Sequence, residues 1–294
     1  MWLKTKPYIL VLPSFILIAA LMVGGIFQGI FQSIFILNDN GSKGISFSVY
    51  KKLFKSEVFW ESFIATIKIS TISTIISAIL GTLIILLLFL LISEKKKKQS
   101  ILLWRLFQIP MLFSYLTCAY TMFLFLTQSG WVSILCYNLG FISDMSEFPI
   151  LVNDKNSIGI IIAYVWKTTP FIVLMLYPAL LKVQDNWIQV AKIFGANIFK
   201  TFSEIVLPML IAPLRTSAFI VFTFIFSAFE VPYLLGVTYP KILGVYSYEL
   251  YMNGDFSERP LALGINIIIC MFIIFISAAY YILNKKHKDK VDNN

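Results

Sequence analysis

The chain has a single histidine, His287, and it lies in a charged tail near the C-terminus. A zinc site of the HExxH or Cys/His kind and a histidine-based catalytic triad are therefore excluded from the apolar segments. The three cysteines, Cys118, Cys136 and Cys270, do not have the spacing of a metal or redox pair. A Gly-x-x-x-x-Gly-Lys-Ser/Thr loop for nucleotide phosphates is also missing. We therefore expect no catalytic residue, no metal and no nucleotide site in this chain.

Charge is scarce as well. Charged residues make up 13% of the chain and hydrophobic residues 59%, whereas about 25% of a soluble domain is charged. With a mean hydropathy of +0.83, the chain belongs in a lipid bilayer. The net charge of +9 comes from lysines grouped in short segments between apolar runs, as in membrane proteins with positive cytoplasmic loops. We therefore expect no nucleic-acid partner.

The apolar runs predict six membrane-spanning helices, because a span needs about 20 apolar residues. Pro110 should kink the third span or mark its start, and Pro170 and Pro178 should break the fourth. The sequence has no internal repeat of fixed period, which favours one membrane domain covering residues 1–294. The predicted spans are residues 8–31, 62–92, 102–126, 157–181, 210–235 and 261–283.

Lysine clusters orient these spans. Lys95–Lys98 follows the second span, and the C-terminal tail, 285–290, carries four more lysines. Both clusters predict the cytoplasmic side, which places both termini inside. The loop at 38–61 also contains four lysines and is the one segment that argues against this topology. The first apolar run is too long for a removable signal peptide, so we expect it to be retained as a span.

A polar stretch, Gln189–Pro208, interrupts the apolar runs between the fourth and fifth spans. Asn186 is a candidate N-cap, and Gln189 follows at the capping-box position. Gly195 should end this first helix, and a second short helix should run from about Asn197 to Leu207 and Pro208. One face of the first helix is apolar at three- and four-residue steps: Trp187, Val190, Ala191, Phe194 and Ile198. We predict a cytoplasmic helix-turn-helix at 186–207.

This stretch resembles the cytoplasmic signature loop of the inner-membrane permease subunits of binding-protein-dependent ABC importers. Gln189 stands where that family usually has Glu, and Phe194 where Asp is common. The segment Val165–Phe171 is similar to the Trp-Lys-x-x-Pro-Phe segment that such permeases carry in the span leading into the loop. The segment Phe229–Gly236 is similar to the end of the next span in the polyamine-type branch, which is related to the maltose-type sugar permeases. The residues that match the family's loop in spacing are Ala191, Gly195, Ala196, Phe202, Ile205, Leu207 and Pro208.

The resemblance implies an all-α membrane protein with the type I ABC importer permease fold, in the prokaryotic cytoplasmic (inner) membrane. It implies four kinds of partner: a second permease subunit, identical or different; ABC ATPase subunits that bind ATP and Mg; an extracytoplasmic solute-binding protein; and the lipid bilayer. The predicted ATPase-coupling residues are Asn186, Trp187, Gln189, Val190, Ala191, Phe194, Gly195, Ala196, Ile198 and Pro208.

Four residues are candidates for the solute path: Trp166, Lys167, Glu230 and Tyr233. Lys167 falls near the middle of the fourth span, where an unpaired charge costs about 2.5–3.5 kcal/mol. It either faces the path or makes a structural ion pair or hydrogen bond between spans. Glu230, beside Pro232, either attracts a cationic solute or pairs with a basic group. The substrate we expect is a small polar or cationic solute such as a polyamine.

Three alternatives stay open. The first is a sugar-type ABC permease. The second is an ATP-independent secondary transporter or channel, which would need a buried pair of acids or an inverted repeat, and the sequence shows neither. The third is a membrane scaffold, which would not need charged residues within its fourth and fifth spans.

Overall fold

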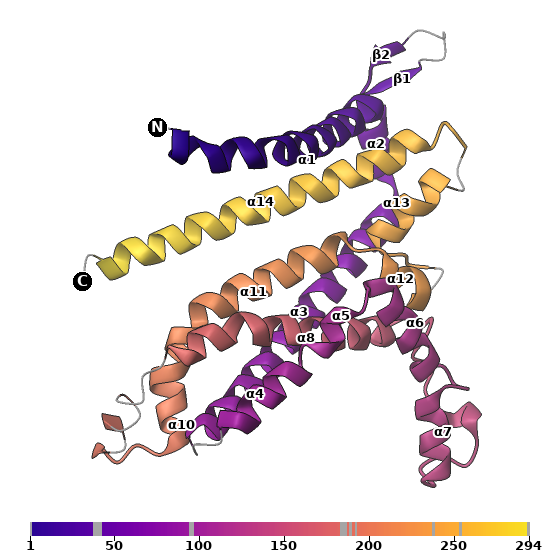
Figure 1. Cartoon of the computed structure of the whole chain (residues 1–294). Coiled ribbons are helices and arrows are strands. Elements are labelled where there is room, and N and C mark those ends of the chain that lie inside the picture. The colour runs from indigo at the N-terminus through magenta and orange to yellow at the C-terminus, as the bar shows by residue number, and fades with distance from the viewer. Residues whose placement is uncertain are drawn as a thin grey trace. The chain divides into compact units, whose positions relative to one another are not determined.

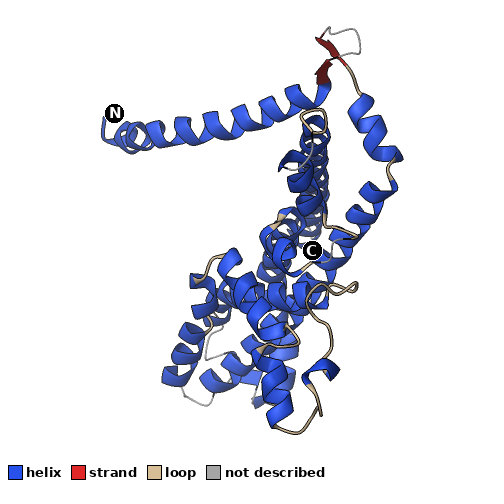
Figure 2. Cartoon of the chain, turned by 90° about the vertical axis from the view of Figure 1, so that its right-hand side faces the viewer, coloured by secondary structure: helices blue, strands red, loops and turns tan. Residues whose placement is uncertain are grey.

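A computed structural model describes residues 2–37, 43–93, 97–182, 187, 190–191, 193–236, 239–252 and 255–292. The described chain is mostly helical, with one short hairpin as its sheet structure (Figure 2). It forms two compact units, one from Met1–Trp60 with Leu243–Asn294, the other from Glu61–Ile242. The single domain expected from the sequence stays a prediction.

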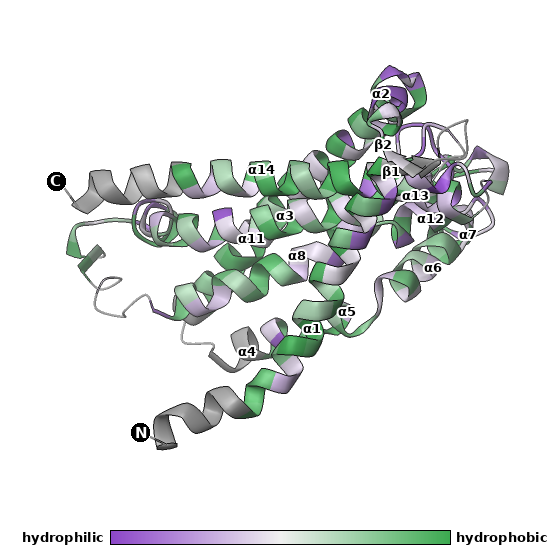
Figure 3. Ribbon diagram, turned by 90° about the horizontal axis from the view of Figure 1, so that it is seen from above, coloured by the Kyte–Doolittle hydropathy of each residue, from purple (hydrophilic) through white to green (hydrophobic). Residues whose placement is uncertain are grey.

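The first unit is organised around its last helix, α14 (Arg259–Asp292), which packs against α1 (Trp2–Ile34), α2 (Ser48–Lys55) and α13 (Leu243–Met252). Figure 3 shows the middle of α14 as a predominantly hydrophobic helix. Between α1 and α2 lie the antiparallel strands β1 (Phe35–Leu37) and β2 (Lys43–Ile45), with Phe35 opposite Ile45.

The second unit is organised around α8 (Ile158–Leu181), in which more than half of the side chains are buried. It packs against α5 (Ile109–Leu112), α6 (Tyr115–Leu126), α11 (Leu207–Ser227) and α12 (Glu230–Leu235). Figure 1 shows α8 and α11 side by side. The other elements are α3 (Glu57–Ser93, which starts in the first unit), α4 (Lys97–Leu106), α7 (Trp131–Asn138), η1 (Met145–Glu147), α10 (Ile198–Thr201) and the π-helix η2 (Phe202–Val206).

Six stretches of the described chain are long and apolar enough to cross a membrane, which confirms the predicted fold class. They are Leu10–Ile34, Glu57–Leu91, Tyr115–Asn138, Ile158–Leu181, Ile198–Ser227 and Arg259–Ile282. Four of them overlap the predicted spans closely. The third is displaced toward the C-terminus of the predicted range, and the fifth, Ile198–Ser227, toward the N-terminus of the predicted range 210–235.

The predicted third span, 102–126, is not one helix. It is divided among α4, α5 and α6, with interruptions at 107–108 and at 113–114. Pro110 explains the first interruption, because a proline ring clashes with the carbonyl four residues earlier, at Leu106, where α4 ends. At the second interruption, the side chain of Ser114 caps α6 by accepting a hydrogen bond from the Thr117 N–H at 3.1 Å. Pro110 therefore does interrupt the helix, as its position predicts.

The prediction that Pro170 and Pro178 break the fourth span is wrong, since α8 runs through both. Within a bilayer a full break would leave several backbone groups without partners, whereas one proline removes one hydrogen bond. The fifth span does break, at Ala228–Phe229. The break lies just before Pro232, which has no N–H to donate to the Ala228 carbonyl and fits the first turn of α12.

The second short helix of the loop does not end at Leu207 and Pro208. Residues 198–227 are continuously helical through α10, η2 and α11. The π-helix explains this continuity, because local π geometry rearranges the backbone hydrogen bonds where Pro208 has no N–H to donate. The loop helix and the fifth span are thus one helix.

Candidate coupling surface and membrane cavity

The turn of the loop is made by Gly195, whose φ is +76°. Trp187, Val190, Ala191 and Ile193 have helical backbone before it. The Ala196 N–H bonds to the Ala191 carbonyl at 3.0 Å, the long reverse bond by which a left-handed glycine closes a helix C-terminus. The structure therefore confirms Gly195 as the helix terminator that the sequence predicts.

The second arm of the loop begins at an N-cap. The Asn197 side chain accepts a hydrogen bond from the Lys200 N–H at 2.8 Å, and the Thr201 hydroxyl donates to the Asn197 carbonyl at 3.0 Å. Such a cap satisfies one backbone donor that has no partner in the first turn. Helix α10 therefore starts at a defined residue, one turn before the π-helix.

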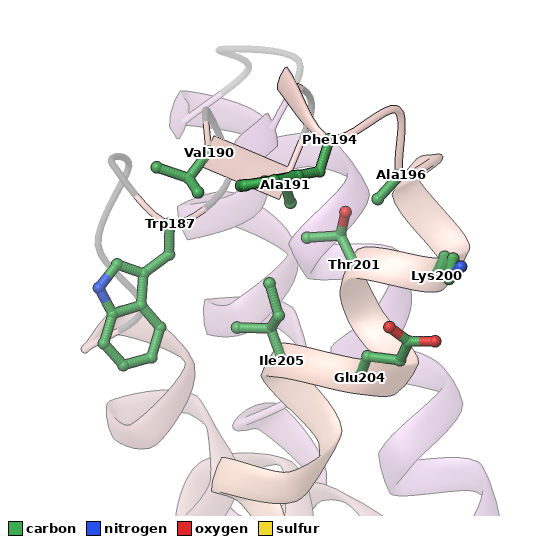
Figure 4. A pocket seen from close by; sticks show the side chains of 9 residues that line it. All are labelled: Trp187, Val190, Ala191, Phe194, Ala196, Lys200, Thr201, Glu204 and Ile205. Carbon is green, nitrogen blue, oxygen red and sulfur yellow. The ribbon is translucent and has the colours of Figure 1, made fainter.

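A hollow of about 530 Å³ lies between the two arms (Figure 4). Its first wall comes from the segment before the turn, and its second from the helix that follows. Ala191 is buried, whereas Phe194 is 85% exposed. The lining residues are Trp187, Val190, Ala191, Phe194, Ala196, Lys200, Thr201, Glu204 and Ile205.

Most of the described coupling candidates meet at this hollow. Trp187, Val190, Ala191, Phe194 and Ala196 line it, and Gly195 makes the turn beside it. Two others are placed elsewhere: Ile198 is half-buried against the core, and Pro208 is exposed in the first turn of α11. Asn186 and Gln189 lie outside the described residues.

The sequence-based list of coupling residues omits the second wall of the hollow: Lys200, Thr201, Glu204 and Ile205. A signal for it was available. Thr201 and Ile205 are four residues apart and so share a face of one helix. Ile205 also belongs to the matched positions of the family's loop. The role of all these residues in docking stays a prediction.

Lys167 lies in α8 and is only 5% exposed. Its ammonium donates hydrogen bonds to the carbonyl of Pro110 at 2.6 Å and to that of Phe113, and it lies 5.2 Å from the centre of the Tyr115 ring. Both carbonyls belong to the short interrupted segment around α5. Carbonyls at a helix end have no intrahelical partner, so the interruption supplies the acceptors that a buried ammonium needs. The sequence left two roles open for Lys167: facing the solute path, or making an ion pair or hydrogen bond between spans. These contacts are hydrogen bonds of the second kind.

Lys167 also lines a cavity of about 220 Å³. The rings of Tyr115 and Phe224 pack at 4.4 Å between centroids on its wall. Behind it, the Thr168 hydroxyl donates to the Tyr164 carbonyl at 2.8 Å, and Ser77 hydrogen-bonds to Thr168 at 2.8 Å. The cavity wall is aromatic and aliphatic apart from Lys167 and Thr168: Met111, Phe113, Tyr115, Phe171, Ile220, Val221 and Phe224.

Glu230 is the first residue of α12 and is partly buried. Its carboxylate is close enough to Tyr115 and Tyr164 to act on both electrostatically. The Tyr164 hydroxyl is buried and has no hydrogen-bond partner among the described residues. Glu230 does not line the cavity.

The other two path candidates lie away from the cavity. Trp166 is half-buried against the core of the unit, and Tyr233 is exposed, its ring 6.1 Å from that of Phe229. Sequence reasoning missed the wall contributed by residues 111–115. Pro110 was the residue in the sequence that could have indicated this wall, because it interrupts the helix at this point.

Together, the six apolar helices and the helical turn between the fourth and fifth spans define a multi-pass membrane permease. The chain belongs to the family of binding-protein-dependent transport system inner membrane components, which it matches over residues 68–289. It is therefore a permease subunit of an ABC importer, a multi-pass protein of the inner membrane. This membership decides against the ATP-independent transporter and the scaffold left open by the sequence.

Among curated relatives, the chain is 25% identical to the diacetylchitobiose uptake system permease protein DasB of Streptomyces coelicolor over 252 residues, covering 83% of this chain and 75% of DasB. It is also 25% identical to the spermidine/putrescine transport system permease protein PotB of Haemophilus influenzae over 259 residues, covering 85% of this chain and 86% of PotB. The relatives thus divide between sugar and polyamine systems, and the polyamine branch is only one of several.

Among solved structures, the fold matches a chain of a bacterial alginate ABC transporter in complex with an alginate pentasaccharide-bound periplasmic protein. The TM-score is 0.72 at 18% identity, and the match covers 94% of each chain. A second alginate transporter structure matches with the same TM-score at 19% identity. The predicted type I ABC importer permease fold is confirmed.

Proposed function

We propose that this permease subunit forms a solute pathway with a second permease subunit, identical or different, and accepts solute from an extracytoplasmic binding protein. ATP and Mg are bound by a separate ATPase, which docks on the hollow between Trp187 and Ile205. In this proposal both termini and the docking hollow are cytoplasmic. The single observation that carries it is the exposed apolar wall on a polar loop between two spans.

The wall is suited to docking because its large side chains stay in water in the isolated chain. Fully burying a side chain such as Phe194 contributes about 1.5–3 kcal/mol. Lys200 and Glu204 on the second wall add charges that select the orientation of a partner. A helix from the ATPase that filled the hollow would contact both arms, and its movement would displace the fifth span as a rigid body.

For the solute, we propose a small polar or cationic molecule such as a polyamine. Support comes from Glu230, a partly buried acid at the start of α12, and from the similarity to PotB.

A sugar is the second candidate. The aromatic wall of the cavity, with Phe113, Tyr115, Phe171 and Phe224, provides flat apolar faces of the kind that pack against sugar rings. DasB and the alginate transporter belong to sugar systems by name. This candidate differs from the first in needing no acid at Glu230.

The test is purification of the tagged chain from its native membranes, followed by ATPase measurements in vesicles with the binding protein. We expect a second permease chain and an ATPase chain to copurify, and ATP hydrolysis to rise with spermidine or putrescine. Stimulation by an oligosaccharide alone would establish the sugar candidate. A chain that transports solute without any ATPase would contradict the whole proposal.

A further inference from the structure

A short helix of the first unit, α2, carries a charged face that importer function does not explain. The chain leaves the first candidate span at Ile34 and enters the second at Glu57. Helix α2, Ser48–Lys55, lies between these points, so it lies at one surface of the membrane. Figure 3 shows hydrophilic residues gathered on α2.

Helix α2 is held firmly by its inner face. Val49 and Leu53 are buried and reach α14 at Gly264, where a Cβ would lie 2.9 Å from a Val49 methyl group. Close approach at a glycine allows two helices to pack tightly. The Tyr50 hydroxyl is hydrogen-bonded to the Ser33 hydroxyl at 2.8 Å, which joins α2 to the end of α1. These contacts fix the orientation of α2, and therefore that of its opposite face, relative to α14 and α1.

That opposite face carries three exposed lysines, Lys51, Lys52 and Lys55, which we call the lysine face. The nearest acids along the chain, Glu57 and Glu61, belong to α3, and the structure records no ion pair between described residues and the lysine face. Three cations on about one and a half helical turns repel one another. Their arrangement is stabilised when an anion binds between them.

Exposed aromatic side chains border the lysine face. Phe47 and Phe54 are seven residues apart, about two helical turns, and so lie along one side of α2. Trp60 is 43% exposed, packs its ring 6.1 Å from that of Phe54, and donates its indole N–H to the Phe54 carbonyl at 2.9 Å. Aromatic side chains beside lysines are typical of the boundary between headgroups and acyl chains. We call these three residues the aromatic edge.

We propose that the lysine face binds the phosphate headgroups of anionic phospholipids, with the aromatic edge at the acyl boundary. Lysines close to a membrane surface each contribute about 1 kcal/mol of attraction to anionic lipid. Lipid accounts for the lysines and the aromatic edge together.

The end of α1 continues this surface. Ser33, which bonds Tyr50, follows the exposed apolar side chains Phe27, Ile30 and Phe31. A lipid whose phosphate reaches the lysine face therefore has an apolar helix along which its acyl chains can lie. An acidic protein partner would match the charge but would leave the aromatic edge and this part of α1 uncovered. These features favour a lipid over a protein.

The test uses the full permease complex in nanodiscs of phosphatidylcholine alone or mixed with phosphatidylglycerol. Brominated phosphatidylglycerol should quench tryptophan fluorescence more than brominated phosphatidylcholine does, and the excess should disappear in Trp60→Phe. In the double variant Lys51→Gln with Lys55→Gln, the preference for phosphatidylglycerol should fall by roughly fivefold for each lysine removed.

Two matched variants separate a site from a general charge effect. Lys155→Gln with Lys182→Gln removes the same charge from exposed positions elsewhere and should leave the preference unchanged. Lys51→Arg with Lys55→Arg keeps the charge and should keep the preference. Equal quenching by both lipids, or an equal loss in the Lys155/Lys182 variant, would overturn the proposal. Unchanged quenching with weaker capture of the binding protein by the Lys51/Lys55 variant would assign the lysine face to a protein partner instead.

Discussion

The membrane cavity and the coupling hollow lie in the same unit but differ in the kind of side chain that each places in an unfavourable environment. At the cavity, a charged group is buried in an apolar span, and the interruption around α5 supplies carbonyls that satisfy it. At the hollow, apolar side chains are exposed on a polar loop, and the described chain offers nothing that covers them. The first region is complete within one chain. The second is covered by another molecule only if the ATPase docks there as proposed, in which case substitutions at the cavity should change folding and substitutions at the hollow should change assembly.

The largest expected effect is that of Lys167→Met. Methionine removes the donor shared by the carbonyls of Pro110 and Phe113 within a membrane span, which should lower the free energy of unfolding by about 2–5 kcal/mol. The measurement is thermal unfolding of the purified complex in detergent. Lys182→Met, at an exposed position, is the control and should unfold as the wild type does. A Lys167→Met protein with unchanged stability and normal transport would show that the cavity does not need its lysine.

The next largest effect is that of Gly195→Asp, which should abolish copurification of the ATPase. A side chain at Gly195 meets open space, so the cost to folding is limited to about 1–2 kcal/mol for the left-handed backbone. The charge, in contrast, enters an apolar docking surface. Gly195→Asn, which tolerates this backbone and has no charge, is the control. If both variants lose the ATPase equally, the backbone and not the charge controls docking.

Phe194→Ser should weaken ATPase binding about tenfold or more, as expected for truncation of an exposed aromatic anchor. Its thermal stability should stay unchanged, because the side chain is 85% exposed. Phe141→Ser, at a position 76% exposed on a different loop, should alter neither quantity. ATPase affinity can be measured by titration into nanodiscs. If Phe194→Ser lost stability but kept its affinity for the ATPase, Phe194 would serve folding, as Lys167 is expected to do at the cavity, and not assembly.

The smallest effect is that of Glu230→Gln. The carboxylate at the start of α12 contributes about 0.3–1 kcal/mol through the helix dipole, so folding and assembly should survive. Uptake of a cationic solute should fall severalfold, whereas uptake of a neutral sugar should not change. The check is transport of radiolabelled spermidine and of a neutral oligosaccharide by the same vesicles. An equal fall for both solutes would assign Glu230 to structure.

The sequence predicted the helical class, the number of spans and the glycine turn, because each depends on a local signal. Apolar length determines a span, and the left-handed backbone at Gly195 favours glycine. The prolines were harder. Pro110 and Pro232 interrupt helices, whereas Pro170 and Pro178 do not, and this difference depends on tertiary contacts that no local window contains. The partners of Lys167 were unpredictable for the same reason, since they lie more than 50 residues away.

The π-helix at Phe202–Val206 determines how the fifth span is rotated about its own axis relative to the loop helix before it. The continuous helix Ile198–Ser227 has 30 residues, about 45 Å at 1.5 Å per residue. A π-turn contains one residue more than an α-turn, and one residue corresponds to a rotation of about 100°. Deleting one residue there would keep both ends chemically intact but turn the loop end relative to Leu210 and Val221, which are buried in the span. The extra residue thus determines how the face that lines the hollow is oriented relative to the face that lines the cavity.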